Sequence, residues 1–289
     1  MQKKRKGRVI SVINVKGGVG KTTTSAYLAF ALRDRGYKVL AMDLDASANL
    51  TCYLEPRFDF EDPEYTCLDA FTGDVKTRDT IVNVGENLDL MPSGIELAFM
   101  FWTSEGESKN FSIDDNTIVR DEINQVREDY DFIVVDTPPT LGPMMQNALC
   151  ASDDLIIPCS MDKDSVKALG YMKMFIDMVT GREEGSNHRN GANPNLRVAG
   201  VLATKCSWNT NNTKIIHEKL KAVADESGYK MFDAAVRSET YVSEARIMSE
   251  PLMRYKRNSN AVKDFNKFID EYLRDLKRYL NGQKMKGEG

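Results

Sequence analysis

The sequence predicts an α/β fold: a single domain with a doubly wound, mostly parallel β-sheet flanked by helices. Short β-branched segments alternate along the chain with segments whose apolar residues recur at helical spacing, a pattern typical of parallel strands joined by helices. A glycine-rich stretch at residues 17–20 lies between the first such strand and the first such helix. The 289 residues suffice for one large core.

The order of the elements follows from the same patterns. We expect the folded domain to span residues 8–281, with a basic disordered tail at residues 1–7 and a second disordered tail at residues 282–289. Short apolar runs predict buried strands at 9–14, 39–42, 87–92, 130–136, 154–158, 196–204 and 229–232. Helical periodicity predicts helices at 22–35, 118–127, 165–179, 215–227, 242–248 and 261–280, with at least one helical turn at 68–71.

The glycine-rich stretch has the composition of a phosphate-binding loop. Between a strand and a helix, such a loop directs backbone N–H groups and the positive end of the helix dipole into one concavity. The glycines allow close approach of the backbone, Lys21 can reach the outer phosphates, and the Thr22 hydroxyl can ligate magnesium. An ordinary glycine-rich turn is the alternative, and the flanking strand and helix disfavour it. The predicted site comprises Lys16, Gly17, Gly18, Val19, Gly20, Lys21, Thr22 and Thr23.

Three aspartates stand at the ends of predicted strands. Because ligands bind beyond the carboxyl ends of parallel strands, we expect Asp43, Asp45 and Asp136 to face the phosphate loop. Asp43 or Asp45 can orient a water molecule for attack on a terminal phosphate, or either can cap a turn or helix. Asp136 is placed like the carboxylate of a Walker B strand, which reaches magnesium directly or through water.

Composition excludes several classes of protein. No apolar run approaches the length of a membrane span and no signal-peptide core follows the basic N-terminus, so we expect a cytoplasmic protein. The five cysteines never occur in C-x-x-C spacing, which argues against a zinc or iron–sulfur site. The net charge of −4 is uneven, because residues 254–289 hold ten basic and five acidic side chains. Such an end favours contact with nucleic acid or anionic membrane, or is simply a solvated face.

One departure from the usual phosphate-loop pattern is informative. Val15 occupies the position that normally holds the first glycine, and an additional lysine, Lys16, follows it. This arrangement resembles the deviant Walker A motif of the ParA/MinD superfamily. With the segments at 43–45, 90–93, 130–139 and 232–245, it makes most of the chain similar to the ParA/Soj family of DNA-partitioning ATPases. The chain departs from many members at 46–47, where Ala-Ser replaces Pro-Gln.

The resemblance implies an ATPase that uses ATP and Mg²⁺ and forms an ATP-bound sandwich homodimer. Lys16 would reach across the dimer to the partner's nucleotide, and Lys21 would hold the phosphates. Thr22 would ligate magnesium, and Asp136 would support the ion through water. Asp45 would position the hydrolytic water.

The resemblance also implies partners. The ATP-bound dimer would bind DNA without sequence preference on the nucleoid, and a centromere-bound ParB-like adaptor would stimulate an otherwise weak hydrolysis, driving plasmid or chromosome segregation. A MinD-like membrane-associated positioning ATPase is the alternative, and a membrane partner is disfavoured because the acidic last helix is better explained as a cover for the sheet. Thr204 and Lys205, at another strand end, are expected at the edge of the base pocket. The DNA-binding candidates are Arg237, Arg246, Arg254, Lys256 and Arg257.

Overall fold

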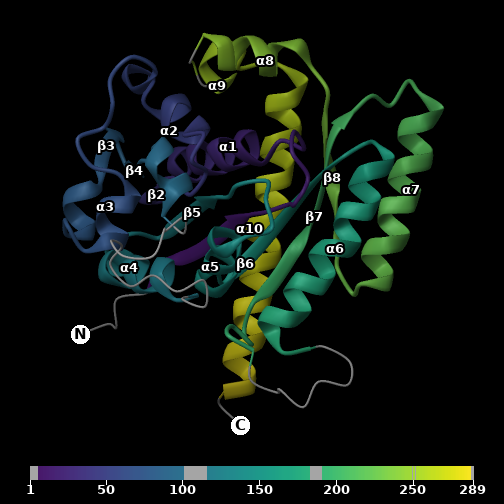
Figure 1. The fold of residues 1–289 in the computed structure, drawn as a ribbon. Helices are drawn as coiled ribbons and strands as arrows, with labels where there is room; N and C mark the ends of the chain where they lie inside the picture. The colour runs from purple at the N-terminus through teal and green to yellow at the C-terminus, as the bar shows by residue number, and fades with distance from the viewer. Residues whose placement is uncertain (1–5, 101–115, 183–190, 249, 251, 288–289) are drawn as a thin grey trace.

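The computed structural model describes residues 6–100, 116–182, 191–248, 250 and 252–287. Its strands are β1 (Arg8–Val12), β2 (Val39–Asp43), β3 (Val82–Gly85), β4 (Leu88–Met91), β5 (Phe132–Asp136), β6 (Asp154–Ser160), β7 (Arg197–Cys206) and β8 (Met231–Arg237). They form one eight-stranded sheet in the order β3-β4-β2-β5-β1-β6-β7-β8 (Figure 1). Only the β3–β4 pair is antiparallel, so the predicted doubly wound, mostly parallel sheet is confirmed.

Helices cover both faces of this sheet (Figure 1). One face carries α1 (Lys21–Asp34), α2 (Asn49–Leu54), α8 (Thr240–Ile247), α9 (Leu252–Tyr255) and α10 (Asn260–Gly287). The other carries α3 (Cys67–Thr72), α4 (Ile118–Val126), α5 (Pro143–Ala151), α6 (Lys163–Thr180) and α7 (Asn211–Glu226). Short 3-10 helices lie at Pro56–Asp59, Thr77–Thr80, Ile95–Phe99 and Arg127–Asp129.

The central strands β2 and β5 are apolar up to their final aspartates, because both of their faces are covered. Every residue of β2 and β5 is buried, as expected for parallel strands packed between two helical layers. Their register pairs Asp43 with Asp136, and Val12 of β1 pairs with the same Asp136. The topology therefore brings together the carboxyl ends of β1, β2 and β5 and the loop that follows β1.

At the β8 edge of the sheet, two buried carboxylates from α10 bind backbone donors of the strand. Glu271 accepts hydrogen bonds from the N–H groups of Asp233, at 3.1 Å, and Ala234, at 3.0 Å. Asp264 accepts one from the N–H of Arg237 at 3.2 Å. Both carboxylate residues are buried, at 3% and 4% exposure. Helix α10 thus closes the β8 edge with side-chain acceptors.

Two expected boundaries are wrong. Gly7 is buried and its N–H donates to the Arg127 carbonyl at 2.9 Å, so order begins before residue 8. Helix α10 continues to Gly287, past the expected end at 281. Gly282 lies within it and does not take the positive φ that ends many helices. Residues 1–5 and 288–289 of the expected tails lie outside the described residues. Helices α2 and α5 and strand β3 were not predicted.

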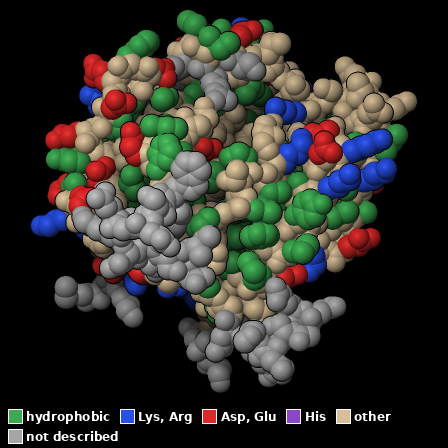
Figure 2. All heavy atoms as spheres, in the orientation of Figure 1, with side chains coloured by type: hydrophobic (Ala, Val, Ile, Leu, Met, Phe, Trp, Pro, Cys, Tyr) green, Lys and Arg blue, Asp and Glu red, His purple; other side chains and the backbone are tan. Residues whose placement is uncertain are grey.

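The outer face of α6 is apolar. Tyr171, Met174 and Met178 are 55%, 66% and 45% exposed, and apolar side chains gather over this helix in Figure 2. Their spacing puts them on one side of the helix, away from the core-facing residues. Within the described ranges, no helix has both the length and the apolar character needed to span a bilayer.

Candidate functional site

The glycine-rich loop turns sharply between β1 and α1. Gly18 and Gly20 have φ angles of 73° and 90°, a left-handed conformation that costs other residues free energy. Gly17 has no such requirement, since a Cβ added there would lie 4.0 Å from the Pro139 Cβ, an ordinary contact. Helix α1 begins at Lys21, and the first N–H groups of a helix have no acceptor within it. N–H groups without an acceptor at a helix start are suited to bind an anion.

The Lys21 side chain lies inside this loop. The residue is 7% exposed, and its Nζ donates to the Lys16 carbonyl oxygen at 3.3 Å. Burial lowers the pKa of Lys21, and the nearby Asp136 and Asp45 carboxylates oppose that shift. An ammonium held by one backbone oxygen beside two acids can transfer to a bound phosphate with little rearrangement.

Asp136 ends β5 in complete burial. Its Oδ1 accepts from Ser25 Oγ at 2.8 Å, whereas Oδ2 is buried and has no hydrogen-bond partner among the described residues. Burial raises the pKa of Asp136, while the hydroxyls of Thr22 and Ser25 and the Lys21 ammonium oppose the shift. A buried carboxylate oxygen without a partner calls for a cation or its bound water.

The donors at this point fit magnesium. Asp136 and Thr22 supply hard oxygen ligands, which this ion prefers. Within the part of the chain that the structure describes, no cluster of three or more His, Cys, Asp and Glu residues could hold a metal. A magnesium ion here would accordingly take most of its ligands from water and from a bound phosphate, as is usual for this ion.

Asp43 and Asp45 have different environments. Strand β2 ends at Asp43, whose Oδ1 accepts from the Asp45 N–H at 3.0 Å and whose Oδ2 accepts from the N–H and hydroxyl of Thr51, both at 2.9 Å. Burial, and then the charge of Asp136, raises the pKa of Asp43. Asp45 is half-buried, and its Oδ1 accepts from the Ser47 N–H at 2.9 Å. Asp43 therefore holds the turn, and Asp45 has the carboxylate with access to solvent.

The Lys16 ammonium lies on its own protomer's β6–α6 turn. Its Nζ donates to Asp162 Oδ2 at 2.7 Å and to Ser160 Oγ at 3.2 Å. Asp162 is also the N-cap of α6, because its Oδ1 accepts from the Ser165 N–H at 3.0 Å. Burial acts to raise the pKa of Asp162, but the hydrogen bonds from Lys16, Ser160 and the Ser165 N–H outweigh it and hold the pKa at about 2. This carboxylate is thus an ionised partner for Lys16.

Several supporting residues were not predicted. The Asn14 side chain accepts from the Lys16 N–H at 2.9 Å and donates to the Pro158 carbonyl at 2.8 Å, which ties the start of the loop to β6. Ser25 and Thr51 hold Asp136 and Asp43 in the same way. Asn14 alone carried a sequence signal, as a polar residue directly after an apolar strand.

Thr204 and Lys205 are near the carboxyl end of β7, beside the loop. Thr204 Oγ1 donates to the Val19 carbonyl at 2.8 Å, so this residue supports the loop backbone directly. Lys205 is exposed and has a φ of 53°, which marks a sharp change in chain direction. Both residues line a cavity of about 190 Å³ that reaches from Gly20 to Glu239.

The five DNA-binding candidates do not form one patch of free cations. Arg237 is bound to Asp264, with Nε–Oδ2 and Nη2–Oδ1 distances of 2.6 and 3.0 Å, so its charge is already paired. Arg254, Lys256 and Arg257 lie at and just after α9, are exposed, and form no ion pair with a described residue. The side chain of the remaining candidate, Arg246, lies outside what the structure describes.

Comparison with known proteins agrees with this geometry. A family model described as an AAA domain matches residues 7–188. The sporulation initiation inhibitor protein Soj of Bacillus subtilis (strain 168) is 31% identical to the chain over 251 residues, which cover 86% of this chain and 91% of Soj. The chain belongs to the ParA/Soj family.

Other members and neighbours of the ParA/Soj fold match over similar lengths. The chromosome partitioning protein ParA of Myxococcus xanthus (strain DK1622) is 27% identical over 267 residues, covering 90% of this chain and 85% of that protein. The crystal structure of cobyrinic acid a,c-diamide synthase from Mycobacterium smegmatis with bound ADP and magnesium has a TM-score of 0.75 and 26% identity. That alignment covers 94% of this chain and 96% of the synthase chain. The predicted ParA/Soj resemblance is confirmed.

Proposed function

We propose that this chain is a partition ATPase that binds ATP with Mg²⁺, forms an ATP-sandwich homodimer and binds DNA without sequence preference. One observation carries the proposal: Lys21, Asp45 and Asp136 converge beside the glycine loop, and Asp136 Oδ2 is buried without a described partner. The Mycobacterium smegmatis synthase, which shares this fold, has bound ADP and magnesium, and this supports a nucleotide and Mg²⁺ as ligands of the present chain.

In the proposed mechanism, Lys21 Nζ moves from the Lys16 carbonyl to the outer phosphates. The Thr22 hydroxyl would hold magnesium directly, and Asp136 would hold it through water. The bound ion would neutralise charge on the transferring phosphate. Asp45 accepts a hydrogen bond from the attacking water and aligns it with the terminal phosphate.

Dimer formation depends on Lys16 in this proposal. Its ammonium leaves Asp162 and binds the nucleotide of the partner subunit, where several phosphate oxygens replace a single, partly exposed carboxylate. A lysine delivered by the second protomer neutralises phosphate charge only in the dimer. Hydrolysis is therefore weak in the monomer, and a ParB-like adaptor is expected to stimulate it by acting on the dimer.

For DNA contact we favour Arg254, Lys256 and Arg257, because they are exposed and form no ion pair with a described residue, although the Lys256 ammonium lies 5.0 Å from the centre of the Tyr241 ring. The resulting location is the nucleoid, in the cytoplasm. The MinD-like alternative is not supported, because the apolar stripe of α10 is used in the core: Phe268, Ile269 and Tyr272 are each 0% exposed. A helix whose apolar side faces the sheet has none left for lipid.

Cosedimentation tests the proposal. The purified chain is mixed with an arbitrary DNA duplex or with anionic liposomes, each with ATP, ADP or no nucleotide. We expect sedimentation with DNA only in the presence of ATP, falling steeply as salt is raised. Binding to liposomes without binding to DNA would overturn the proposal.

A further inference from the structure

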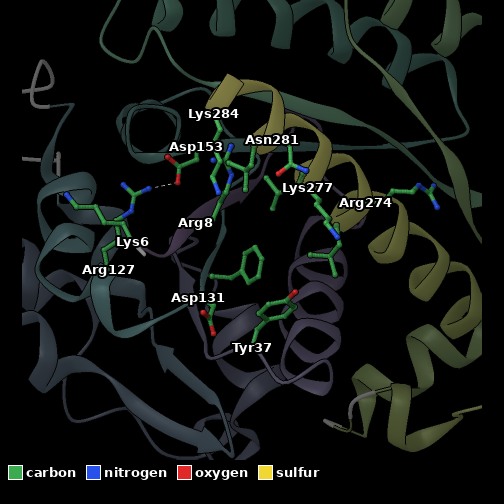
Figure 3. A pocket seen from close by; sticks show the side chains of 14 residues that line it. Lys6, Arg8, Tyr37, Arg127, Asp131, Asp153, Arg274, Lys277, Asn281 and Lys284 are labelled. Carbon is green, nitrogen blue, oxygen red and sulfur yellow. Dashed lines mark hydrogen bonds and ion pairs between the residues drawn. The ribbon is translucent and has the colours of Figure 1, made fainter. Parts of the chain in front are cut away.

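A second, larger cavity lies at the opposite edge of the sheet from the phosphate loop (Figure 3). Its volume of about 790 Å³ is within the range of small-molecule sites. It opens between the amino ends of β1 and β5 and the last turns of α10. Its apolar lining comprises Tyr37, Phe132, Leu273, Leu276 and Leu280.

Positive charge is concentrated around this cavity. Six cationic and two acidic side chains line it, although the whole chain has a net charge of −4. Two of the cations are occupied: Arg8 is bound to Asp154 at 2.8 Å, and Arg127 is bound to Asp153. The other four are exposed and form no ion pair with a described residue: Lys6, Arg274, Lys277 and Lys284.

The free cations are spread along the cavity. Ten residues of α10 separate Arg274 from Lys284, which corresponds to about 15 Å at the helical rise. Asn281 lies between them with an amide that can donate or accept. A single inorganic phosphate cannot contact both ends, whereas an extended anion with two charged groups can.

The lining between the charges is suited to a flat or apolar group. The rings of Tyr37 and Phe132 meet edge to face with centroids 4.9 Å apart, and Tyr37 remains half-buried. In Figure 3 the Tyr37 side chain lies below Arg8, while Lys277, Asn281 and Lys284 project from α10 above it. Duplex DNA would contact only the outer cations, because it cannot enter a cavity of this size and would leave the aromatic lining unused.

We propose that this cavity binds an organic polyanion of nucleotide size, with two separate negatively charged groups and a flat or apolar group in the same molecule, as in a nucleoside bisphosphate. The cations bind the charged groups, and the aromatic and leucine side chains pack against the flat or apolar group. This site is independent of the nucleotide site proposed above, because the cavity lies at the amino ends of β1 and β5 and the phosphate loop lies at their carboxyl ends.

Equilibrium dialysis with adenosine 3′,5′-bisphosphate tests the inference on the full chain. The titration is run with and without saturating ADP and Mg²⁺, which separates the cavity from the phosphate loop. We expect one site that persists with ADP, and an affinity at least about tenfold weaker in Lys277→Glu/Lys284→Glu, where two charge-assisted contacts are reversed. The matched control is Lys263→Glu/Lys267→Glu, on exposed positions of α10 outside the cavity, and its affinity should change less than about twofold.

Two comparisons establish the ligand class. Pyrophosphate has the negative charges but no flat or apolar group, and it should bind more weakly than the bisphosphate. The Leu280→Gln change should weaken bisphosphate binding and leave pyrophosphate binding unchanged. Bisphosphate binding that disappears with ADP, or that survives the Lys277→Glu/Lys284→Glu change, would overturn the inference. Pyrophosphate binding as tight as that of the bisphosphate would also overturn it. A DNA duplex that displaces the bisphosphate, and that binds the Leu280→Gln variant as well as the unmodified chain, would assign the surface to nucleic acid.

Discussion

Lys16 Nζ and Asp162 Oδ2 lie 2.7 Å apart within one protomer. The lysine assigned to the partner's nucleotide therefore has a competing partner in its own chain. The two side chains are 24% and 43% exposed, so solvent screens the pair, and such pairs contribute at most about 1 kcal/mol. That is enough to shift a dimerisation equilibrium measurably without preventing it.

Asp162→Asn should strengthen ATP-dependent dimerisation. Asparagine removes the charge that holds Lys16 but keeps an oxygen acceptor for the Ser165 N–H, so α6 stays capped. We expect the dimer dissociation constant with ATP to fall by a factor of about two to five, measured by sedimentation velocity in an Asp45→Ala background. A weaker dimer would show that Asp162 supports the interface rather than competing with it.

Lys16→Ala should abolish ATP-dependent dimerisation while leaving nucleotide binding intact. Lys21 and the loop backbone still hold the phosphates, but the partner subunit no longer receives the lysine charge. Sedimentation velocity reports the dimer, and fluorescence titration with a labelled ATP reports binding. Lys163→Ala, at an exposed lysine nearby on α6, serves as the control. Normal dimerisation of the Lys16 variant refutes its role across the interface.

Asp45→Ala should give a dimer that forms with ATP but does not hydrolyse it. Loss of the carboxylate that orients water is expected to lower kcat by at least about 100-fold, measured as phosphate release with and without DNA. Ser47→Ala is a suitable control, because the Ser47 N–H that binds Asp45 is retained. Undiminished turnover by the Asp45 variant would mean that another group positions the water.

Arg254→Glu/Arg257→Glu should weaken DNA binding and flatten its salt dependence. For every DNA phosphate that the variant no longer neutralises, the slope of log affinity against log salt becomes shallower by about 0.9. Fluorescence anisotropy with a labelled duplex measures both quantities in the presence of ATP. Lys214→Glu/Lys221→Glu changes exposed lysines on α7 by the same charge, and its affinity should stay higher. Equal losses in the two variants would point to net charge alone.

Asp136→Asn should stabilise the nucleotide-free chain more at alkaline than at acidic pH. Burial raises the pKa of Asp136 to about 6, whereas an aspartate in an unfolded chain has a pKa of about 3.9. The folded chain thus binds more protons between these values, so stability from this group is complete below about pH 4 and declines as pH rises through about 6. Asparagine mimics the protonated acid.

Thermal melts without Mg²⁺ measure this effect. We expect the melting temperature of Asp136→Asn, relative to the unmodified chain, to increase between about pH 5 and about pH 8. Asp164→Asn, at an exposed aspartate of α6, should show no such trend. A difference in melting temperature that is the same at both pH values would show that folding does not raise the pKa of Asp136.

The sequence predicted those parts of the site whose residues are close together in the chain. The expectations for the loop at 16–23, for Asp45 just beyond β2 and for Asp136 at the end of β5 follow from local periodicity and from the rule that ligands bind beyond the carboxyl ends of parallel strands. Asp162 was missed because it lies 146 residues from Lys16, and no local pattern joins them. Arg237 was misjudged for the same reason, since only the folded chain brings Asp264 against it.

Glu271 and Asp264 of α10 also limit how copies of this chain can assemble. An edge strand normally offers its unpaired N–H groups to a strand from another molecule. Here the donors of Asp233, Ala234 and Arg237 already have carboxylate acceptors. Two copies consequently cannot fuse their sheets through β8 into one continuous sheet without displacing α10. At this edge of the sheet, copies of the chain can meet only through side chains, and a chain shortened before Asp264 would expose the three N–H groups again.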